Sequence, residues 1–224
     1  MELFGDHFSL SDRVSQLIEN SILDGSIRPG QRIIESDIAE RLGISKAPVR
    51  EALKRLEGHD MVQHLPRRGY FATTIDLKRI NDFFDIAFII EPLVARNALK
   101  KRDEDIEEKI DNLLERMKKV LRNKDYEKYM ALNAQFHSLF RELNDNEWII
   151  KISHMLSKQA RILTALSLSL TQRHFASIRE HAAIADAYKK GDPRALNLAV
   201  RKHLKNFKEN IIKSYDSLGV KEEI

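Results

Sequence analysis

Two short helices joined by a glycine turn are predicted over residues 35–57, and this unit constrains the fold more than any other stretch of the chain. The segment is ESDIAERLGISKAPVREALKRLE. Ile38, Ala39 and Leu42 recur at the three- and four-residue spacing of an amphipathic helix. Gly43 then suits the left-handed residue that ends a helix. The first half of the unit is therefore predicted to be one short helix that packs on its apolar face.

The second helix of the unit has a basic outer face. Ser45 is expected to cap it, and Pro48 falls in its first turn, where a missing N–H does no harm. The predicted buried stripe consists of Val49, Ala52, Leu53 and Leu56. The opposite face carries Lys46, Arg50 and Lys54. A helix-turn-helix presents its recognition helix to the major groove of DNA in this way, so the pattern predicts DNA binding.

The flanking segments complete a winged helix-turn-helix. Residues 11–23 have helical spacing, with Ser11 as the expected cap, and residues 31–34 are expected to be extended. Residues 61–65 and 70–73 are predicted strands around the turn that contains Arg67 and Arg68. Arginines at the tip of a wing suit phosphate or minor-groove contacts. Taken alone, the same pattern also fits an ordinary surface hairpin with solvated arginines.

Composition and charge bound the class of protein. The chain of 224 residues has no cysteine, which excludes disulfides and thiolate metal sites. No apolar run approaches the roughly 20 residues of a transmembrane helix, and the N-terminus lacks the pattern of a signal peptide. We therefore expect a cytoplasmic protein with no membrane partner. The net charge of +4 is only a weak indication of nucleic acid, so the DNA prediction depends on the local pattern.

Residues 76–224 are predicted to form a separate all-helical domain, which leaves residues 1–75 as the DNA-binding domain. The expected helices span residues 77–100, 103–122, 126–143, 147–169, 173–190 and 193–217. Helices of this length with short polar turns form an antiparallel bundle. The predicted fold class is mainly α: an N-terminal winged helix-turn-helix with a small β-wing, then an antiparallel bundle of about six helices.

Four side chains of the second domain are expected to converge. Asn133 and His137 are four residues apart and project from one face of a helix. His181 and His203 lie equally far from the turn at Asp192, so a hairpin there brings them to the same height on neighbouring helices. Metal sites of helix bundles are built from such side chains. Taken singly, each histidine also fits a surface or satisfied core position. The remaining histidines, interpreted as structural, are His7, His59, His64, His154 and His174.

The N-terminal half resembles a known family. The run DGSIRPGQRIIESDIAERLGISKAPVREALKRLEGHDMVQHLPRRGYF looks like the DNA-binding domain of the GntR family of bacterial transcription regulators. The resemblance implies DNA contacts from Ser36, Ser45, Lys46, Ala47, Arg50, Arg68 and Gly69. Arg50 suits a bidentate contact to guanine, whereas Ser45, Lys46 and the wing arginines, Arg67 and Arg68, suit phosphates. Lys54 and Arg55 are interpreted as solvated surface charges.

The C-terminal half resembles the FCD subgroup of the same family in the segments IIEPLVARNAL, NAQFH, SIREHAAIADAYKKGDPRAL and AVRKHL. This resemblance implies a divalent metal ion, with zinc or nickel suited to the donors, held by Asn133, His137, His181 and His203. Asparagine stands where the subgroup commonly has aspartate. The resemblance also implies an organic carboxylate effector. Ala87 stands where the subgroup usually has a ligand-facing arginine, and Arg161 is either its replacement or a surface arginine.

These patterns predict a transcription regulator that binds a pseudo-palindromic double-stranded DNA operator as a homodimer, with affinity modulated by a small organic acid bound at the metal. A purely structural metal without an effector is an alternative, which Ala87 favours. A metal-dependent hydrolase is another, since a three-histidine centre can activate water. That alternative lacks an obvious general base: Glu180 is expected on a different helix face from His181, and Glu142 lies a full turn beyond His137.

Overall fold

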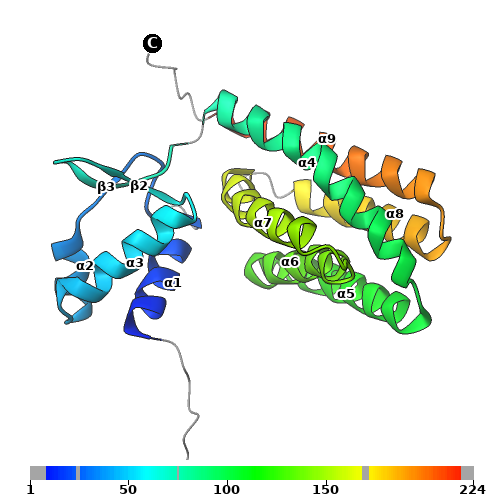
Figure 1. Cartoon of the computed structure of the whole chain (residues 1–224), viewed down its shortest axis with the longest axis horizontal. Helices are drawn as coiled ribbons and strands as arrows, with labels where there is room; N and C mark the ends of the chain where they lie inside the picture. Colours follow the sequence, from blue (N-terminus) through cyan, green and yellow to red (C-terminus); the bar gives the residue numbers. More distant parts are fainter. Residues whose placement is uncertain (1–8, 24–25, 75, 168–171, 218–224) are drawn as a thin grey trace, which may run out of the picture. The chain divides into compact units, whose positions relative to one another are not determined.

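The computed structural model describes residues 9–23, 26–74, 76–167 and 172–217, and they form two compact units that divide between residues 75 and 76 (Figure 1). The fold is mainly helical with one small sheet, as predicted. Among the helices of these residues, none is long and apolar enough to cross a membrane.

The first unit contains three helices and a three-stranded antiparallel sheet. Its elements are α1 (Leu10–Leu23), β1 (Arg32–Ile33), α2 (Glu35–Leu42), α3 (Lys46–Gly58), β2 (Val62–Leu65) and β3 (Gly69–Ala72). Helix α3 packs against α1 and α2 through a stripe that the sequence predicted, and Val49, Leu53 and Leu56 have no exposed surface. Gly43 ends α2 with φ of 66°, which confirms its role as the left-handed cap.

The sheet has one strand more than the predicted hairpin. Strand β3 lies between β1 and β2, and β1 pairs Arg32 with Phe71 and Ile33 with Tyr70. The sequence predicted residues 31–34 as extended, but their pairing depends on a segment almost forty positions away, which no local pattern reveals. The hairpin of β2 and β3 turns through Arg67, whose φ is 64°, and Gly69, whose φ is 92°.

Two predicted helix caps are wrong in detail. Ser9, not Ser11, caps α1: the Ser9 hydroxyl accepts a hydrogen bond from the Asp12 amide, and the Asp12 carboxylate accepts one from the Ser9 amide. This reciprocal pair resembles a capping box, and Ser11 is buried inside the helix instead. Ser45 does hold the N-cap position of α3, yet within the described unit its side chain makes no capping hydrogen bond.

The second unit is the predicted helical bundle. It consists of α4 (Leu77–Ala98) with a 3₁₀ turn η1 (Leu99–Lys101), α5 (Glu104–Arg122), α6 (Tyr126–Glu142), α7 (Glu147–Ser167), α8 (Gln172–Lys189) and α9 (Pro193–Ser217). The last two residues of the helix predicted over 147–169 lie outside the described residues. Aspartates 76, 103, 125 and 192 accept amide hydrogen bonds at the starts of α4, α5, α6 and α9.

Packing around α4 positions the interior of the bundle. Helix α4 contacts α6, α7 and α9, while α8 packs against α5 and α9 (Figure 1). The hairpin of α8 and α9 turns at Gly191, whose φ is 64°, and at Asp192, as the sequence predicted. Helices α4, α6, α8 and α9 therefore all face a common interior, which is where the three histidines meet.

Candidate functional sites

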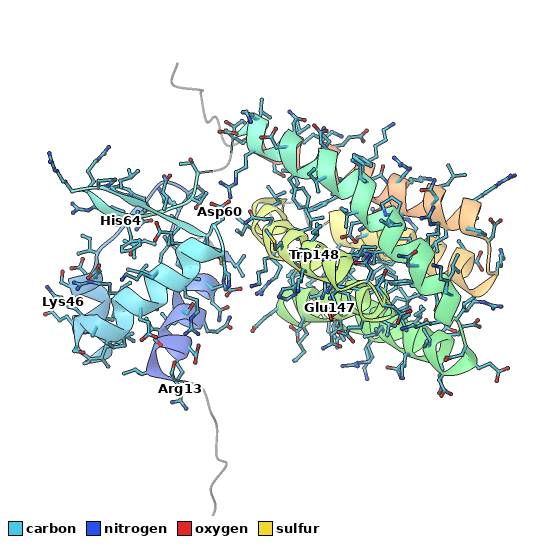
Figure 2. The ribbon with its side chains drawn as sticks, in the orientation of Figure 1. Arg13, Lys46, Asp60, His64, Glu147 and Trp148 are labelled. Atoms are coloured by element: carbon cyan, nitrogen blue, oxygen red, sulfur yellow. The ribbon has the colours of Figure 1, made fainter. Side chains whose placement is uncertain are left out.

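The N-terminal half of α3 exposes the side chains that the sequence assigned to DNA. Ser45, Lys46, Ala47 and Arg50 are all exposed, and Lys46 projects from the free end of the helix (Figure 2). Ser36 and Gly69 are partly exposed. The apolar stripe of α3 holds the helix on its opposite side, so this polar edge is free to meet a groove.

Arg50 is held by an ion pair that the sequence analysis did not anticipate. Its Nε and Nη2 both donate to Glu35 Oε2, at 3.1 and 3.0 Å, and Glu35 is the first residue of α2. This hydrogen bond and the Glu35 charge raise the pKa of Arg50, which stays a cation. Because Glu35 takes up the Nε–Nη2 edge of the guanidinium, the N–H groups of Nη1 are left for another acceptor. Glu35 thereby orients the arginine that we assign to guanine.

The other basic side chains of this unit divide into two groups. Arg67 and Arg68 are exposed on the wing, and the Arg68 guanidinium lies 5.5 Å from the centre of the Phe71 ring. Arg55, which was interpreted as solvated, instead forms an ion pair with Asp12 and ties α3 to α1. Lys54 is exposed. The wing arginines therefore remain available for phosphate, whereas Arg55 has a structural partner.

In the second unit, three histidines from three helices come together. His137 of α6, His181 of α8 and His203 of α9 offer ligand atoms that all lie within 4.8 Å of one another. The Nε2 atoms of His137 and His181 are 3.2 Å apart. Two imidazole nitrogens bound tetrahedrally to one zinc ion lie roughly 3.3 Å apart, so the donor set and the spacing fit such an ion. The same distance also allows an N–H···N hydrogen bond between neutral rings.

Burial withdraws this cluster from water and lowers the pKa of one of its histidines, His137. His181 has no exposed surface and His203 is 9% exposed. Burial, with repulsion from His203 and Arg141, lowers the pKa of His137 from 6.5 to about 3. A metal ion binds the neutral imidazole, so desolvation here removes the competing proton. Asn133 lies one turn before His137 and lines the same cavity, where its amide oxygen is the candidate fourth donor.

Glu180 supports the cluster from outside. Its Oε2 lies 2.7 Å from His203 Nδ1, and its Oε1 accepts a hydrogen bond of 2.8 Å from Asn206 Nδ2. A carboxylate at Nδ1 fixes the tautomer that leaves Nε2 as the metal donor. The sequence analysis considered Glu180 only as a base beside His181. The symmetry of the hairpin about Asp192, which predicted the pairing of His181 with His203, places Glu180 within one position of the level of His203 and could have indicated it.

A cavity of about 440 Å³ opens beside the cluster and is walled mainly by apolar side chains. Asn133, His137 and His203 line it, and so does Ala87, which brings no charge. Arg161 also lines it, although its side chain is exposed.

The cavity wall contains polar residues that the sequence analysis missed. Arg141 is half-buried there, one turn beyond His137 on α6. Glu91 lies in the wall too, and its Oε1 accepts a hydrogen bond of 3.0 Å from Ser153. Burial raises the pKa of Glu91, against the opposing effects of Ser153 and of the Arg141 charge. The i, i+4 spacing of Asn133, His137 and Arg141 was the available signal for Arg141.

The other histidines are distributed between the wall and the surface. His174 is 4% exposed, lines the cavity and lies 4.8 Å from the Tyr129 ring. His154 also lines it, from α7. His64 packs on Tyr70 of the wing, and His59 ends α3. His7 lies outside the described residues. The interpretation of His174 as merely structural therefore overlooked its place in the cavity wall, seven residues and two helical turns before His181.

Both units are similar to known bacterial proteins. Residues 10–71 match the bacterial regulatory proteins of the gntR family, and residues 82–206 match the FCD domain. The HTH-type transcriptional regulator YdhC of Bacillus subtilis is 25% identical over 87% of each chain. The HTH-type transcriptional repressor RspR of Escherichia coli is 23% identical over 90% of this chain and 89% of that one. The structure of E. coli McbR/YncC superposes with a TM-score of 0.77 at 19% identity, covering 94% of this chain and 99% of the other.

Proposed function

The chain is a DNA-binding transcription regulator of the GntR family with an FCD domain, and from that premise we propose that it binds a pseudo-palindromic operator as a homodimer under the control of a carboxylic acid. The observation that carries this proposal is the cluster of His137, His181 and His203 opening on a cavity large enough for a small ligand. The name of RspR supports repression as the sign of control.

Operator recognition is proposed to depend on α3 and the wing. Arg50 contacts guanine through the end of its guanidinium that Glu35 leaves open. Ser45, Lys46, Arg67 and Arg68 contact phosphates, with Ser36, Ala47 and Gly69 close to the backbone of the DNA. These eight residues are those that the resemblance and the wing implied, and their exposure supports the assignment.

The metal ion, zinc or nickel by its donor set, would be held by Asn133, His137, His181 and His203. When bound, it supplies a Lewis-acidic position that a carboxylate oxygen can occupy. The residues of the chain do the rest: Glu180 orients His203, burial keeps the His137 imidazole neutral, and the apolar part of the wall excludes water from the ligand.

Helix α4 is proposed to couple ligand binding in the cavity to DNA binding. This helix begins at Leu77, directly after the boundary between the two units, and its residues Ala87 and Glu91 line the cavity. A ligand that prefers one position of α4 changes the spacing of the two DNA-binding domains in a dimer, and thus operator affinity.

Dimerisation is supported by large apolar side chains exposed on two helices that pack together. On α4 these are Ile86 and Ile89, and on α7 they are Trp148 and Met155, of which Trp148 is 72% exposed (Figure 2). An operator with two-fold symmetry requires two copies of the recognition helix. Sedimentation of the Ile89→Glu variant tests this surface, because a charge there should shift the chain towards monomer.

The base-reading assignment is tested by operator binding, measured as fluorescence anisotropy of a labelled duplex. Arg50→Ala should weaken binding by roughly 5- to 150-fold per half-site and relax the preference for guanine. Lys54→Ala is the matched control on the same helix and should change affinity little. Wild-type affinity in Arg50→Ala would remove Arg50 from the reading surface.

The sensing assignment is tested by the same assay with zinc-loaded and chelated protein, each with and without organic acids. Operator affinity should depend on the acid. A structural metal without an effector is the second candidate, favoured by the uncharged Ala87 in the wall. In that case chelation lowers the melting temperature, and no acid changes operator affinity.

A further inference from the structure

One cation in the cavity wall has no carboxylate counter-ion among the residues that the structure describes. Arg141 is half-buried in the wall, and its Nη2 donates a hydrogen bond of 2.7 Å to Ser138 Oγ. Among the described residues, no carboxylate lies within ion-pair distance of its guanidinium. A charge withdrawn from water costs free energy unless it is paired, so a bound anion would stabilise this arrangement.

Glu91 does not supply that negative charge. It is the acidic side chain in the wall, but its Oε1 accepts a hydrogen bond from Ser153, it forms no ion pair with Arg141, and burial raises its pKa. Arg141 is close enough to oppose this shift, yet burial is the larger effect. At Arg141 the wall therefore presents a cation that suits the carboxylate of a ligand. Lys158 and Arg161 also line the cavity, and both have other interactions within the chain.

Apolar side chains make up most of the surface of the wall. Phe83 and Ala87 of α4, Met130 of α6, Leu156 of α7, and Leu204 and Phe207 of α9 line it. Ala87 matters most, because its methyl group leaves open the space that a longer side chain would fill. A small, fully hydrophilic acid would leave these groups in contact with trapped water, whereas an aliphatic or aromatic body would cover them.

We propose that the ligand is an amphipathic monocarboxylic acid, with its carboxylate paired to Arg141 and its apolar body over Ala87 between α4 and α9. This inference rests on the proposed function only in treating the cavity as the effector site. It differs from the sequence-based assignment, in which Arg161 was the candidate anchor. Arg161 is exposed on α7, whereas Arg141 shares a helix face with Asn133 and His137.

The test is calorimetric titration of metal-stripped, full-length protein with octanoate, acetate and 1-octanol. Octanoate should bind at least about 100-fold more tightly than acetate, since each buried methylene contributes about fourfold. Arg141→Gln should weaken octanoate by about 10- to 100-fold, the range for a charge-assisted pair, and should leave 1-octanol within about threefold. Retained binding of 1-octanol also shows that the variant keeps its cavity.

Two matched variants sharpen the result. Lys128→Gln removes a cation from the exposed start of α6 and should bind octanoate like the wild type. Arg161→Gln removes the other arginine of the wall and should do the same. The inference is overturned if Arg141→Gln binds octanoate normally, if Arg161→Gln alone loses it, if acetate binds as well as octanoate, or if stripped protein binds none.

Operator binding is then measured with octanoate present, which separates this inference from the proposed function. Octanoate binding through Arg141 with unchanged operator affinity supports the ligand class and refutes the sensing role. Operator affinity that responds to another acid, while Arg141→Gln has no effect, refutes the inference and leaves the sensing role standing.

Discussion

Glu180→Gln should weaken zinc binding even though Glu180 is not a metal ligand. Its two carboxylate oxygens have different partners, His203 Nδ1 at 2.7 Å and Asn206 Nδ2 at 2.8 Å. Both partners donate. A glutamine offers one acceptor oxygen and one NH₂ group, so one of these donors must then face another donor. The substitution preserves size and shape while it removes the group that fixes the His203 ring.

The expected loss follows from the burial of the pair. The side chains of His203 and Glu180 are only 11% and 10% exposed, so water and salt screen their interaction weakly. Removing the hydrogen-bond partner of a metal-bound histidine typically costs 10- to 100-fold in affinity, which is about 1.4–2.7 kcal/mol. The short, shielded contact points to the upper half of that range for zinc.

The assay is competition for zinc between metal-stripped protein and a chromophoric chelator at pH 7.5, with circular dichroism as the check on folding. Glu142→Gln is the matched control: Glu142 is an exposed glutamate that ends α6 and accepts a hydrogen bond from Ser138. It should leave zinc affinity within about threefold. Asn206→Ala should do the same, because Asn206 reaches the metal site only through Glu180.

Two outcomes would refute this reasoning. A folded Glu180→Gln protein with wild-type zinc affinity means that packing alone orients His203. An equal loss in Asn206→Ala means that the tie between α8 and α9, and not the carboxylate at Nδ1, determines affinity.

Three further predictions concern stability. Because the pKa of His137 is 6.5 when unfolded and about 3 when folded, the unfolded chain binds more protons between these values. His137 should therefore make the free energy of unfolding of stripped protein fall as pH drops below about 6.5, by up to about 1.4 kcal/mol per pH unit in urea titrations, and His137→Gln should remove this contribution from the slope. Zinc at about 100 times its Kd should add about 2.7 kcal/mol to wild-type stability and almost nothing to His181→Ala. Leu53→Ala should cost about 2–5 kcal/mol, whereas Leu198→Ala, at a side chain that is 67% exposed, should cost under about 1.

The sequence predicted the elements because their signals are local. Periodic apolar residues define the helices of the second unit within a few positions, aspartates cap four of them, and Gly43 ends α2 as expected. The cluster of His181 and His203 was also predictable, since a hairpin relates two neighbouring helices by simple symmetry. His137 required only that α6 face that hairpin.

Features that depend on packing between distant segments were not predictable in this way. The pairing of β1 with β3 and the contact of Arg50 with Glu35 join residues that no periodic pattern connects. The four-residue spacing of Arg141 from His137 predicts that both lie on one helix face. Whether that face lines a cavity or meets solvent depends on how α4 and α7 pack against it. The N-cap of α1 could not be predicted because Ser9 and Ser11 offer the same hydroxyl two positions apart. Ser9 is the cap because the Asp12 carboxylate accepts a hydrogen bond from its amide.

The ion pair between Arg50 and Glu35 has a consequence for how the protein searches DNA. A cation already balanced by a carboxylate displaces few of the counter-ions condensed on a duplex, so Arg50 adds little to the salt dependence of binding. We propose that Lys46, Arg67 and Arg68, which are exposed, supply that sequence-independent attraction instead. If Arg50 reads the base, as proposed, base selection is largely independent of the electrostatic attraction to phosphates. Raising the salt concentration should then weaken non-operator binding, while the preference for guanine at the Arg50 position is retained.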